Sequence, residues 1–163
     1  MKKKFSNADI DNHFESCARY GIKNVLLLLS GYPTETPEDH ALQLEYLKKY
    51  QIYGLSRTIY SINIEVSGLL FLENTPLLDM QDELQVIFPH WEAAGARDEW
   101  ITFSNPLLTA KERLKRALEI MQTAYKLGYK VLHFHQKIDE AERRAKKYQT
   151  TNQQPMFKME LVS

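Results

Sequence analysis

The sequence predicts a soluble α/β protein, with a short parallel sheet in its first half and a mainly helical extension after it. Residues 7–66 carry helix and strand patterns in the order helix, strand, helix, strand, which is typical of parallel α/β units. The chain has 163 residues, of which 44% are hydrophobic, so it can bury the core of one domain. Basic and acidic residues number 21 each, and this balance lacks the positive charge of a dedicated nucleic-acid binder or a polybasic membrane anchor. We therefore expect neither nucleic acid nor a membrane as a partner.

The first element is predicted to be a helix that begins near Ser6 or Asn7 and ends at Gly21. Serine and asparagine side chains cap helix amino ends, and Asp9 in the first turn suits the positive end of the helix dipole. The helix has one apolar stripe, formed by Ile10, Phe14, Cys17 and Ala18.

Two further segments are predicted to be parallel strands. Residues 25–29, Val-Leu-Leu-Leu-Leu, form a short apolar run, which favours a strand buried on both faces. Residues 57–66 alternate between polar and apolar side chains, which favours a second strand. The helix between them is expected to begin after Thr36, with Pro37 in its first turn.

The second half is predicted to be less regular. Residues 74–95 indicate a turn and an irregular segment, residues 109–128 a capped helix, and residues 139–148 a charge-rich helix. Three aromatic residues are expected to anchor a loop on the core, with a pocket or partner surface as the alternative: Trp91, Trp100 and Phe103. Basic residues with acidic neighbours are expected to form solvated helix faces: Lys111, Arg113, Lys115, Arg116, Arg143, Arg144, Lys146 and Lys147.

Cys17 is the only cysteine, which excludes an intrachain disulfide and a metal site built from cysteines of this chain. His13 precedes it by one helical turn, but the apolar stripe favours a buried thiol over a metal ligand or a nucleophile. His133 and His135 would share one face of a strand, yet no acidic or cysteine ligand stands beside them. We therefore assign no metal site and no catalytic residue. Without a signal peptide or an apolar run of membrane length, the expected location is cytoplasmic.

The segment Ser30–Thr36, Ser-Gly-Tyr-Pro-Thr-Glu-Thr, is the most informative part of the sequence. It would join the carboxyl end of a parallel strand to a helix start, where α/β proteins bind ligands. Gly31 would let a ligand approach the backbone, and Glu35 could accept hydrogen bonds from a ligand amine or hydroxyl. The structural alternative is a tight turn followed by an acidic residue at a helix start.

Residues 31–39, Gly-Tyr-Pro-Thr-Glu-Thr-Pro-Glu-Asp, with the apolar strand before them, resemble the fifth-strand segment of radical S-adenosylmethionine (radical SAM) enzymes. The similarity is strongest to the branch often found with a cobalamin-binding domain. Residues 3–10 are similar to the start of that family's fourth helix. Residues 72–77, Leu-Glu-Asn-Thr-Pro-Leu, resemble a turn after its sixth strand.

This resemblance implies the C-terminal portion of a partial (βα)6 radical SAM-type barrel at residues 1–80. A helical C-terminal extension would follow at 81–150, and a flexible tail at 151–163. In the complete family, S-adenosylmethionine is cleaved reductively at a four-iron four-sulfur cluster. The resemblance assigns four residues to cofactor binding: Leu29, Gly31, Pro33 and Glu35.

The chain departs from the family in the residues that hold the cluster. The family uses a Cys-x3-Cys-x2-Cys loop, and Cys17 alone cannot supply three thiolates. We therefore expect a fragment that forms part of the wall for S-adenosylmethionine and substrate and is inactive alone. Its expected partner is the missing cluster-binding half or a second copy. Two alternatives stay open: a non-catalytic α/β binding or scaffold module, and an unrelated small enzyme that uses Glu35 as a base with Asn63 or Glu65.

Overall fold

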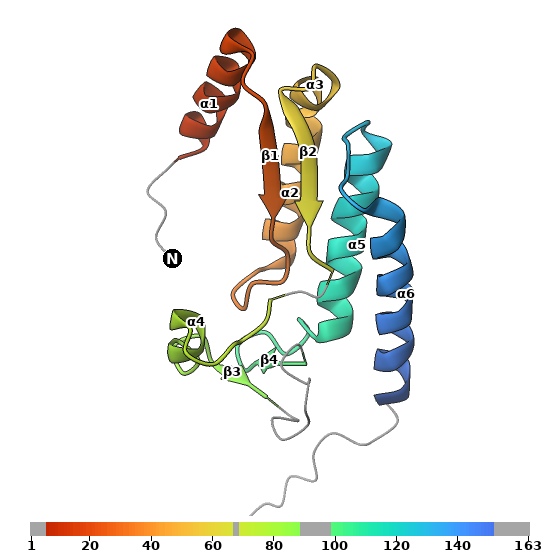
Figure 1. The fold of residues 1–163 in the computed structure, drawn as a ribbon. Helices are drawn as coiled ribbons and strands as arrows, with labels where there is room; N and C mark the ends of the chain where they lie inside the picture. Colours follow the sequence, from red (N-terminus) through yellow and green to blue (C-terminus); the bar gives the residue numbers. More distant parts are fainter. Residues whose placement is uncertain (1–5, 67–68, 89–98, 152–163) are drawn as a thin grey trace, which may run out of the picture.

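The computed structural model describes residues 6–66, 69–88 and 99–151. Its centre is a pair of parallel strands, β1 (Asn24–Leu28) and β2 (Ile59–Ile64), joined by α2 (Pro37–Lys49) and α3 (Gln51–Leu55). Helix α1 (Asn7–Tyr20) precedes β1 and lies on the side of β1 away from β2, while α2 lies behind the sheet in the view of Figure 1. The order of elements over residues 7–66 and the α/β class are therefore confirmed.

The predicted helix ends are confirmed by their hydrogen bonds. Ser6 and Asp9 form a capping box at the start of α1, and Gly21, with φ of 68°, ends this helix in the left-handed conformation. Thr36 and Asp39 form the equivalent capping box at the start of α2, where Pro37 occupies the first turn.

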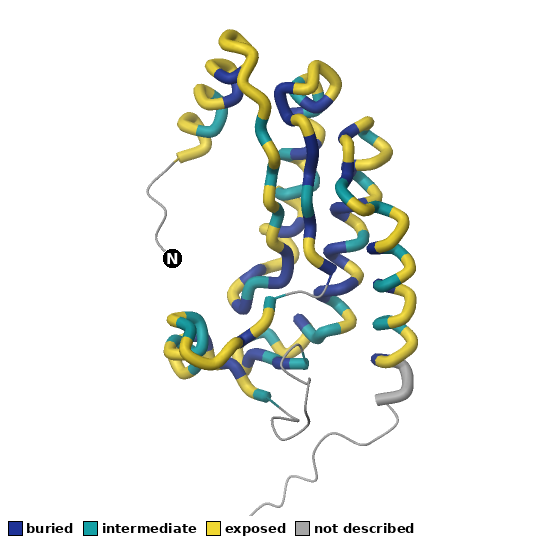
Figure 2. The backbone as a smooth tube through the Cα atoms, viewed as in Figure 1, coloured by how far each residue is buried: buried dark blue, intermediate teal, exposed yellow. Residues whose placement is uncertain are grey.

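The two strands are covered by helices on one face only. Leu26 lies opposite Ile62 and Leu28 opposite Ile64, and these four side chains belong to or pack against the main core. Leu27, between Leu26 and Leu28, is 77% exposed. Partly buried and exposed residues alternate along β1 (Figure 2). The prediction that this strand is buried on both faces is therefore wrong, because no helix of the described chain covers that face of β1.

A small second unit follows β2 and has its own core. It contains α4 (Pro76–Asp79) and the antiparallel strands β3 (Val86–Ile87) and β4 (Ile101–Thr102). Its buried side chains are Phe71, Leu84, Val86 and Trp100. The prediction of an irregular segment missed α4 and β3, because elements of two to four residues leave no periodic pattern. Trp100 anchors this segment as predicted, whereas Trp91 lies outside the described residues. The prediction is wrong for Phe103, whose side chain is 78% exposed.

Helices α5 (Ala110–Lys126) and α6 (Phe134–Thr151) pack against each other beside β2. The predicted cap of α5 is confirmed, because the Thr109 hydroxyl accepts a hydrogen bond from the Glu112 N–H at 3.2 Å. Helix α6 begins earlier than predicted. The prediction of a strand at His133–His135 is wrong: His133 has φ of 55°, the helix starts at the next residue, and the neighbouring strand contact is a single parallel bridge between Val131 and Ile62.

The main core combines residues from both sides of the predicted boundary at residue 80. Phe14, Leu47 and Ile62 come from the first part, and Ile120 and Ala141 come from α5 and α6. The predicted tail from residue 152 onward lies outside the described residues. No helix in the described ranges is long and apolar enough to cross a membrane.

Tyr129 supplies the first testable prediction. Its hydroxyl donates a 2.8 Å hydrogen bond to the carbonyl of Leu47, and burial raises the pKa of this phenol. The unfolded chain then loses the proton first as the pH rises, so the free energy of unfolding should fall above about pH 10. Tyr129→Phe should lower that free energy by about 1 kcal/mol at neutral pH and weaken its alkaline decline.

Urea unfolding from pH 7 to 11, followed by circular dichroism, measures both effects. Tyr125→Phe is the matched control, because the Tyr125 side chain is 53% exposed. An alkaline decline of equal size in wild-type protein and Tyr129→Phe would contradict the prediction.

Candidate functional site

The carboxyl end of β1 runs through a tight loop into the start of α2. Gly31 adopts φ of 79°, a conformation that favours glycine, and the Glu35 N–H donates to the Tyr32 carbonyl at 2.8 Å. The sequence places Pro33 between these two hydrogen-bonded residues, and its ring is fully buried. The loop is thus a hydrogen-bonded turn. It places the Glu35 side chain next to the backbone of Gly31, just after the carboxyl end of β1.

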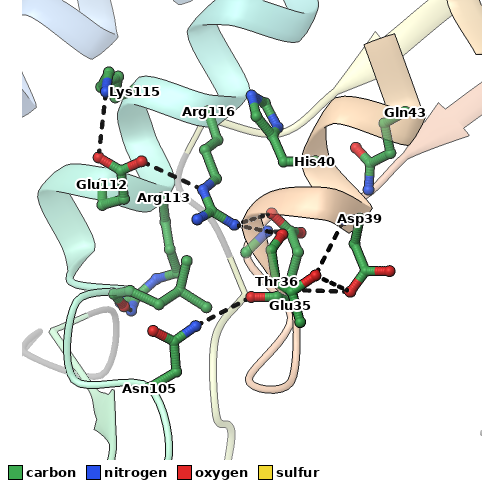
Figure 3. Close-up of polar contacts among 12 residues, drawn as sticks. Glu35, Thr36, Asp39, His40, Gln43, Asn105, Glu112, Arg113, Lys115 and Arg116 are labelled. Carbon is green, nitrogen blue, oxygen red and sulfur yellow. Dashed lines mark hydrogen bonds and ion pairs between the residues drawn. The ribbon is translucent and has the colours of Figure 1, made fainter. Parts of the chain in front are cut away.

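The Glu35 carboxylate is the polar centre of this loop. One carboxylate oxygen accepts a hydrogen bond from the Gly31 N–H at 2.6 Å, and the other pairs with the Arg116 guanidinium at 2.9 Å (Figure 3). Both side chains are buried, with 5% and 8% of their surfaces exposed. A buried ion pair of this kind fixes the loop against α5, because separating the charges would leave each one desolvated and uncompensated.

Further hydrogen bonds surround this pair. Arg116 also donates to the Thr36 carbonyl at 3.2 Å and to the Glu112 carboxylate at 3.4 Å. The Asn105 amide donates to the Glu35 carbonyl at 3.1 Å. The loop after β1 is therefore held by α5 and by the segment after β4 together (Figure 3).

Arg113 fills the space beside Gly31. Its guanidinium donates to the carbonyls of Trp100 and Leu108 at 2.8 and 2.7 Å and lies 3.6 Å from the centroid of the Trp100 ring system. A Cβ atom on Gly31 would come within 2.6 Å of Arg113 Cδ, so the glycine is required for packing inside the protein. The prediction that Arg113 and Arg116 are solvated is wrong: they are 3% and 7% exposed.

The structure gathers the four predicted cofactor-binding residues in this one loop, but in different environments. Leu29 is 47% exposed and presents its side chain to the surface. Gly31, Pro33 and Glu35 are buried and contact the protein itself. Only Leu29 therefore offers a large free side-chain surface to a ligand, and the other three define the shape of the loop.

An open cleft of about 330 Å³ lies between this loop and the exposed side of α2. It is lined by Leu29, Tyr32, Thr34, Glu35, Asp39, Leu42, Gln43 and Tyr46. Two phenol rings and two leucines give it flat apolar surfaces, and Asp39 and Gln43 add polar groups at its side. Such a mixture suits a small ring system that carries hydroxyl or amino groups.

The carboxyl end of β2 holds a buried cation that the sequence analysis did not identify. Lys137, which is 8% exposed, donates from Nζ to the Asn63 side-chain oxygen at 2.7 Å and to the Ile64 carbonyl. The first turn of α6 brings it there, and the misassigned strand at His133–His135 concealed this helical position. Asn63 is thus engaged with a lysine, and Glu65, on the same strand end, is exposed.

Two buried polar atoms near the strand end lack hydrogen-bond partners within the described part of the chain. They are the Ser30 hydroxyl and Nδ1 of His40. The other ring nitrogen of His40 lies 3.1 Å from the Glu119 carboxylate on α5. These contacts add a second link between α2 and α5.

Cys17 lies at the opposite end of β1 from the Glu35 loop. The thiol is 4% exposed, and its sulfur lies 3.6 Å from His13 Nε2 and 3.8 Å from the Asn24 side-chain oxygen, at the start of the strand. Among residues 6–66, 69–88 and 99–151, no group of three or more His, Cys, Asp or Glu side chains is arranged to hold a metal ion. An iron–sulfur cluster therefore does not fit the residues that the structure describes.

Glu35→Gln tests how much the buried ion pair contributes to the free energy of unfolding. The substitution keeps the shape of the side chain but leaves the Arg116 charge without its closest partner, so we expect the free energy of unfolding to fall by about 3 kcal/mol. Glu112→Gln removes the more exposed partner of the same arginine and should cost about 0.5 kcal/mol. Urea unfolding at pH 7, followed by far-ultraviolet circular dichroism, measures the free energy of unfolding of both variants. If the two substitutions lower it equally, Glu35 is not the main partner of Arg116.

Comparison with known proteins gives no relative from which a function could be transferred. No protein-family model matches the chain, and searches of the curated proteins and of the solved structures find no match. Its function is therefore inferred from its residues and from the geometry of this site.

Proposed function

We propose that the chain forms part of the wall of a nucleoside-cofactor site in a radical SAM-type assembly, with S-adenosylmethionine as the cofactor. Two kinds of support agree. The segment Gly31–Asp39 resembles the fifth-strand motif of that family, and the structure has the helix, strand, helix, strand order with parallel strands that such a barrel portion requires. The partial (βα)6 barrel is part of this proposal.

The observation that carries the proposal is the cleft at the carboxyl end of β1. Leu29, Tyr32 and Tyr46 offer apolar and aromatic surfaces that suit an adenine ring. Asp39 and Gln43 are polar neighbours that suit the hydroxyl groups of a ribose. Parallel α/β sheets bind ligands at this end of their strands, so both the position of the cleft and the residues that line it favour ligand binding.

Within this proposal, the predicted residues have two different roles. Leu29 contacts the nucleoside directly. Gly31, Pro33 and Glu35 position the loop, because their contacts are made inside the protein. A carboxylate bound to Arg116 and to a backbone N–H is suited to holding a loop, and less suited to acting as a base. The proposed contribution of this chain is therefore to bind and orient the cofactor.

The iron–sulfur cluster has to come from elsewhere in the proposed assembly. The single thiol of the chain is buried in α1, at the opposite end of β1 from the cleft. We assign no chemical step to this chain through the cluster. Its partner in the proposal is a companion polypeptide that carries the cluster ligands.

A non-catalytic α/β module is the second candidate function. It is favoured by the closed network around Glu35, in which the carboxylate, Arg116, Arg113 and Asn105 all bind groups of the protein itself. A scaffold needs such a fixed loop but needs no nucleoside. Ligand binding by the purified chain separates the two candidates.

Isothermal titration calorimetry with S-adenosylhomocysteine tests the proposed nucleoside site. Wild-type protein should bind it, and Leu29→Asp should weaken binding about tenfold, because a carboxylate would replace the apolar surface beside the ring. Leu55→Asp is the matched control, since Leu55 is also an exposed leucine, at 60%, but lies on α3 outside the cleft. Absence of heat with wild-type protein would favour the non-catalytic module.

Anaerobic reconstitution with iron and sulfide tests the missing cluster. The purified chain should remain colourless after desalting, because one buried thiol cannot hold the cluster. Absorbance in the visible range and iron analysis measure the result. A stable brown protein that cleaves S-adenosylmethionine would contradict the proposed division of roles.

A further inference from the structure

We infer that the amino end of the parallel sheet holds a binding site for a phosphate monoester, formed by Lys23, Arg57 and Lys130 around the phenol of Tyr60. This site lies at the opposite end of the strands from the proposed nucleoside cleft, and it goes beyond that proposal. Figure 1 shows this end at the top of the view, where the arrows of β1 and β2 begin.

The charges of the chain are distributed unevenly, although they balance over its full length. Residues 16–34, 46–64 and 120–138 contain no aspartate and no glutamate. The first segment leads from α1 into β1, the second leads through α3 into β2, and the third leads from α5 through the bridge beside β2 into α6. Because the paired segments run parallel, the fold brings the turns in the middle of all three to the same end of the sheet. These turns contribute basic side chains to that end and no acidic ones.

The three basic residues are positioned by three turns of similar geometry. Helices α1 and α5 are each followed by a glycine with positive φ, Gly21 at 68° and Gly128 at 85°, and in both turns a lysine follows two residues later. In the turn after α3, Arg57 itself has φ of 64°. This conformation is strained for a residue with a Cβ atom, and glycine usually occupies it at the end of a helix. An arginine at such a position indicates a use for its side chain.

The Tyr60 side chain is the point on which the three charges converge. Lys130 Nζ donates a hydrogen bond to the phenol oxygen at 3.0 Å and lies 4.4 Å from the ring centroid. Lys23 Nζ lies 5.5 Å from the same centroid. The pKa of the Tyr60 phenol is lowered, first by the hydrogen bond from Lys130 and then by the charges of all three basic residues. The electrostatic potential is therefore positive at a side chain that is 39% exposed.

The three cations have no carboxylate partner in the part of the chain that the structure describes. Within residues 6–66, 69–88 and 99–151, no ion pair or hydrogen bond joins Lys23, Arg57 or Lys130 to an acidic side chain, and all three are exposed. Lys49, at the end of α2, does not belong to this cluster, because Asp11 pairs with it at 2.7 Å. Folding therefore brings like charges together, and a bound anion would relieve their repulsion.

The chemistry of the cluster favours a phosphate group over a carboxylate. A phosphate monoester has a charge between about −1.5 and −2 at pH 7 and presents three terminal oxygens as acceptors. A guanidinium donates two parallel hydrogen bonds to such a group, and lysine ammonium groups add point charges. Since Lys130 donates to the Tyr60 oxygen, the phenol proton remains available for a hydrogen bond to the bound phosphate.

Isothermal titration calorimetry with glycerol 3-phosphate, at pH 7 and constant ionic strength, tests the site. Wild-type protein should bind this monoester saturably, and Arg57→Gly and Lys130→Gln should each weaken binding about fivefold. Arg57→Gly suits the positive φ, so urea unfolding should show no loss of stability in this variant.

Lys111→Gln is the matched control, because Lys111 is an exposed lysine at the opposite end of α5 from the turn that carries Lys130. It removes the same charge and should leave binding unchanged. Absence of saturable binding by wild-type protein, or equal weakening by Lys111→Gln, would overturn the inference.

Two labelled oligothymidylates of ten nucleotides, one with a 5′-phosphate and one without, distinguish the sources of the phosphate. We expect neither to bind more tightly than glycerol 3-phosphate. Binding that requires the 5′-phosphate would support the monoester site and assign it to the end of a longer molecule. Tight binding without the 5′-phosphate would assign the cluster to a nucleic-acid backbone and overturn the inference. S-adenosylhomocysteine contains no phosphate, so the nucleoside cleft and this site succeed or fail independently.

Discussion

The buried ion pair between Glu35 and Arg116 is the interaction on which the rest of the site depends. It joins the loop after β1 to α5 across 81 positions of sequence, at a place where both side chains are buried. The carboxylate also receives the Gly31 N–H, so the same group fixes the turn and its distance from the helix. Without this charge pair, the desolvation of either partner would oppose the observed loop conformation.

This arrangement separates the residues that shape the loop from the surface that faces outward. Glycine, proline and glutamate at positions 31, 33 and 35 make contacts within the protein, while Leu29 and Tyr32 line the open cleft. A motif that could be interpreted as a set of ligand contacts is therefore mainly a set of packing and hydrogen-bonding requirements. A loop that is held rigid by packing and hydrogen bonds within the protein can still present a defined surface to a ring-shaped ligand.

The elements that the sequence predicted correctly are those determined by residues that lie close together in the sequence. Ser6, Thr36 and Thr109 cap helices through residues three positions later, and the two strands follow from short apolar and alternating runs. The burial of Arg113 and Arg116 could not be predicted in this way. Both sit among charged neighbours on α5, and their partners, Trp100, Leu108 and Glu35, are brought to them only by the tertiary fold.

The same distinction explains the errors on the sheet. The apolar run of β1 predicted burial on both faces, but coverage depends on which helices pack there, and the described helices leave Leu27 exposed. At His133 the alternation of histidine and phenylalanine suggested a strand, whereas a backbone with positive φ turns the chain directly into α6. The position of Lys137 beside Asn63 follows from that turn, so the sequence pattern could not predict it.

The stacking of Arg113 on Trp100 has a practical consequence for studying the molecule in solution. The indole is inaccessible to water and has a guanidinium cation 3.6 Å above it, while the alkyl part of the same arginine lies against Gly31. In a Trp91→Phe variant, which leaves Trp100 as the single tryptophan of the sequence, the fluorescence emission is therefore sensitive to the contact between the small second unit and the loop after β1. The wavelength of maximum emission and the intensity therefore report when the contact between Trp100 and Arg113 loosens, even where the helices remain intact.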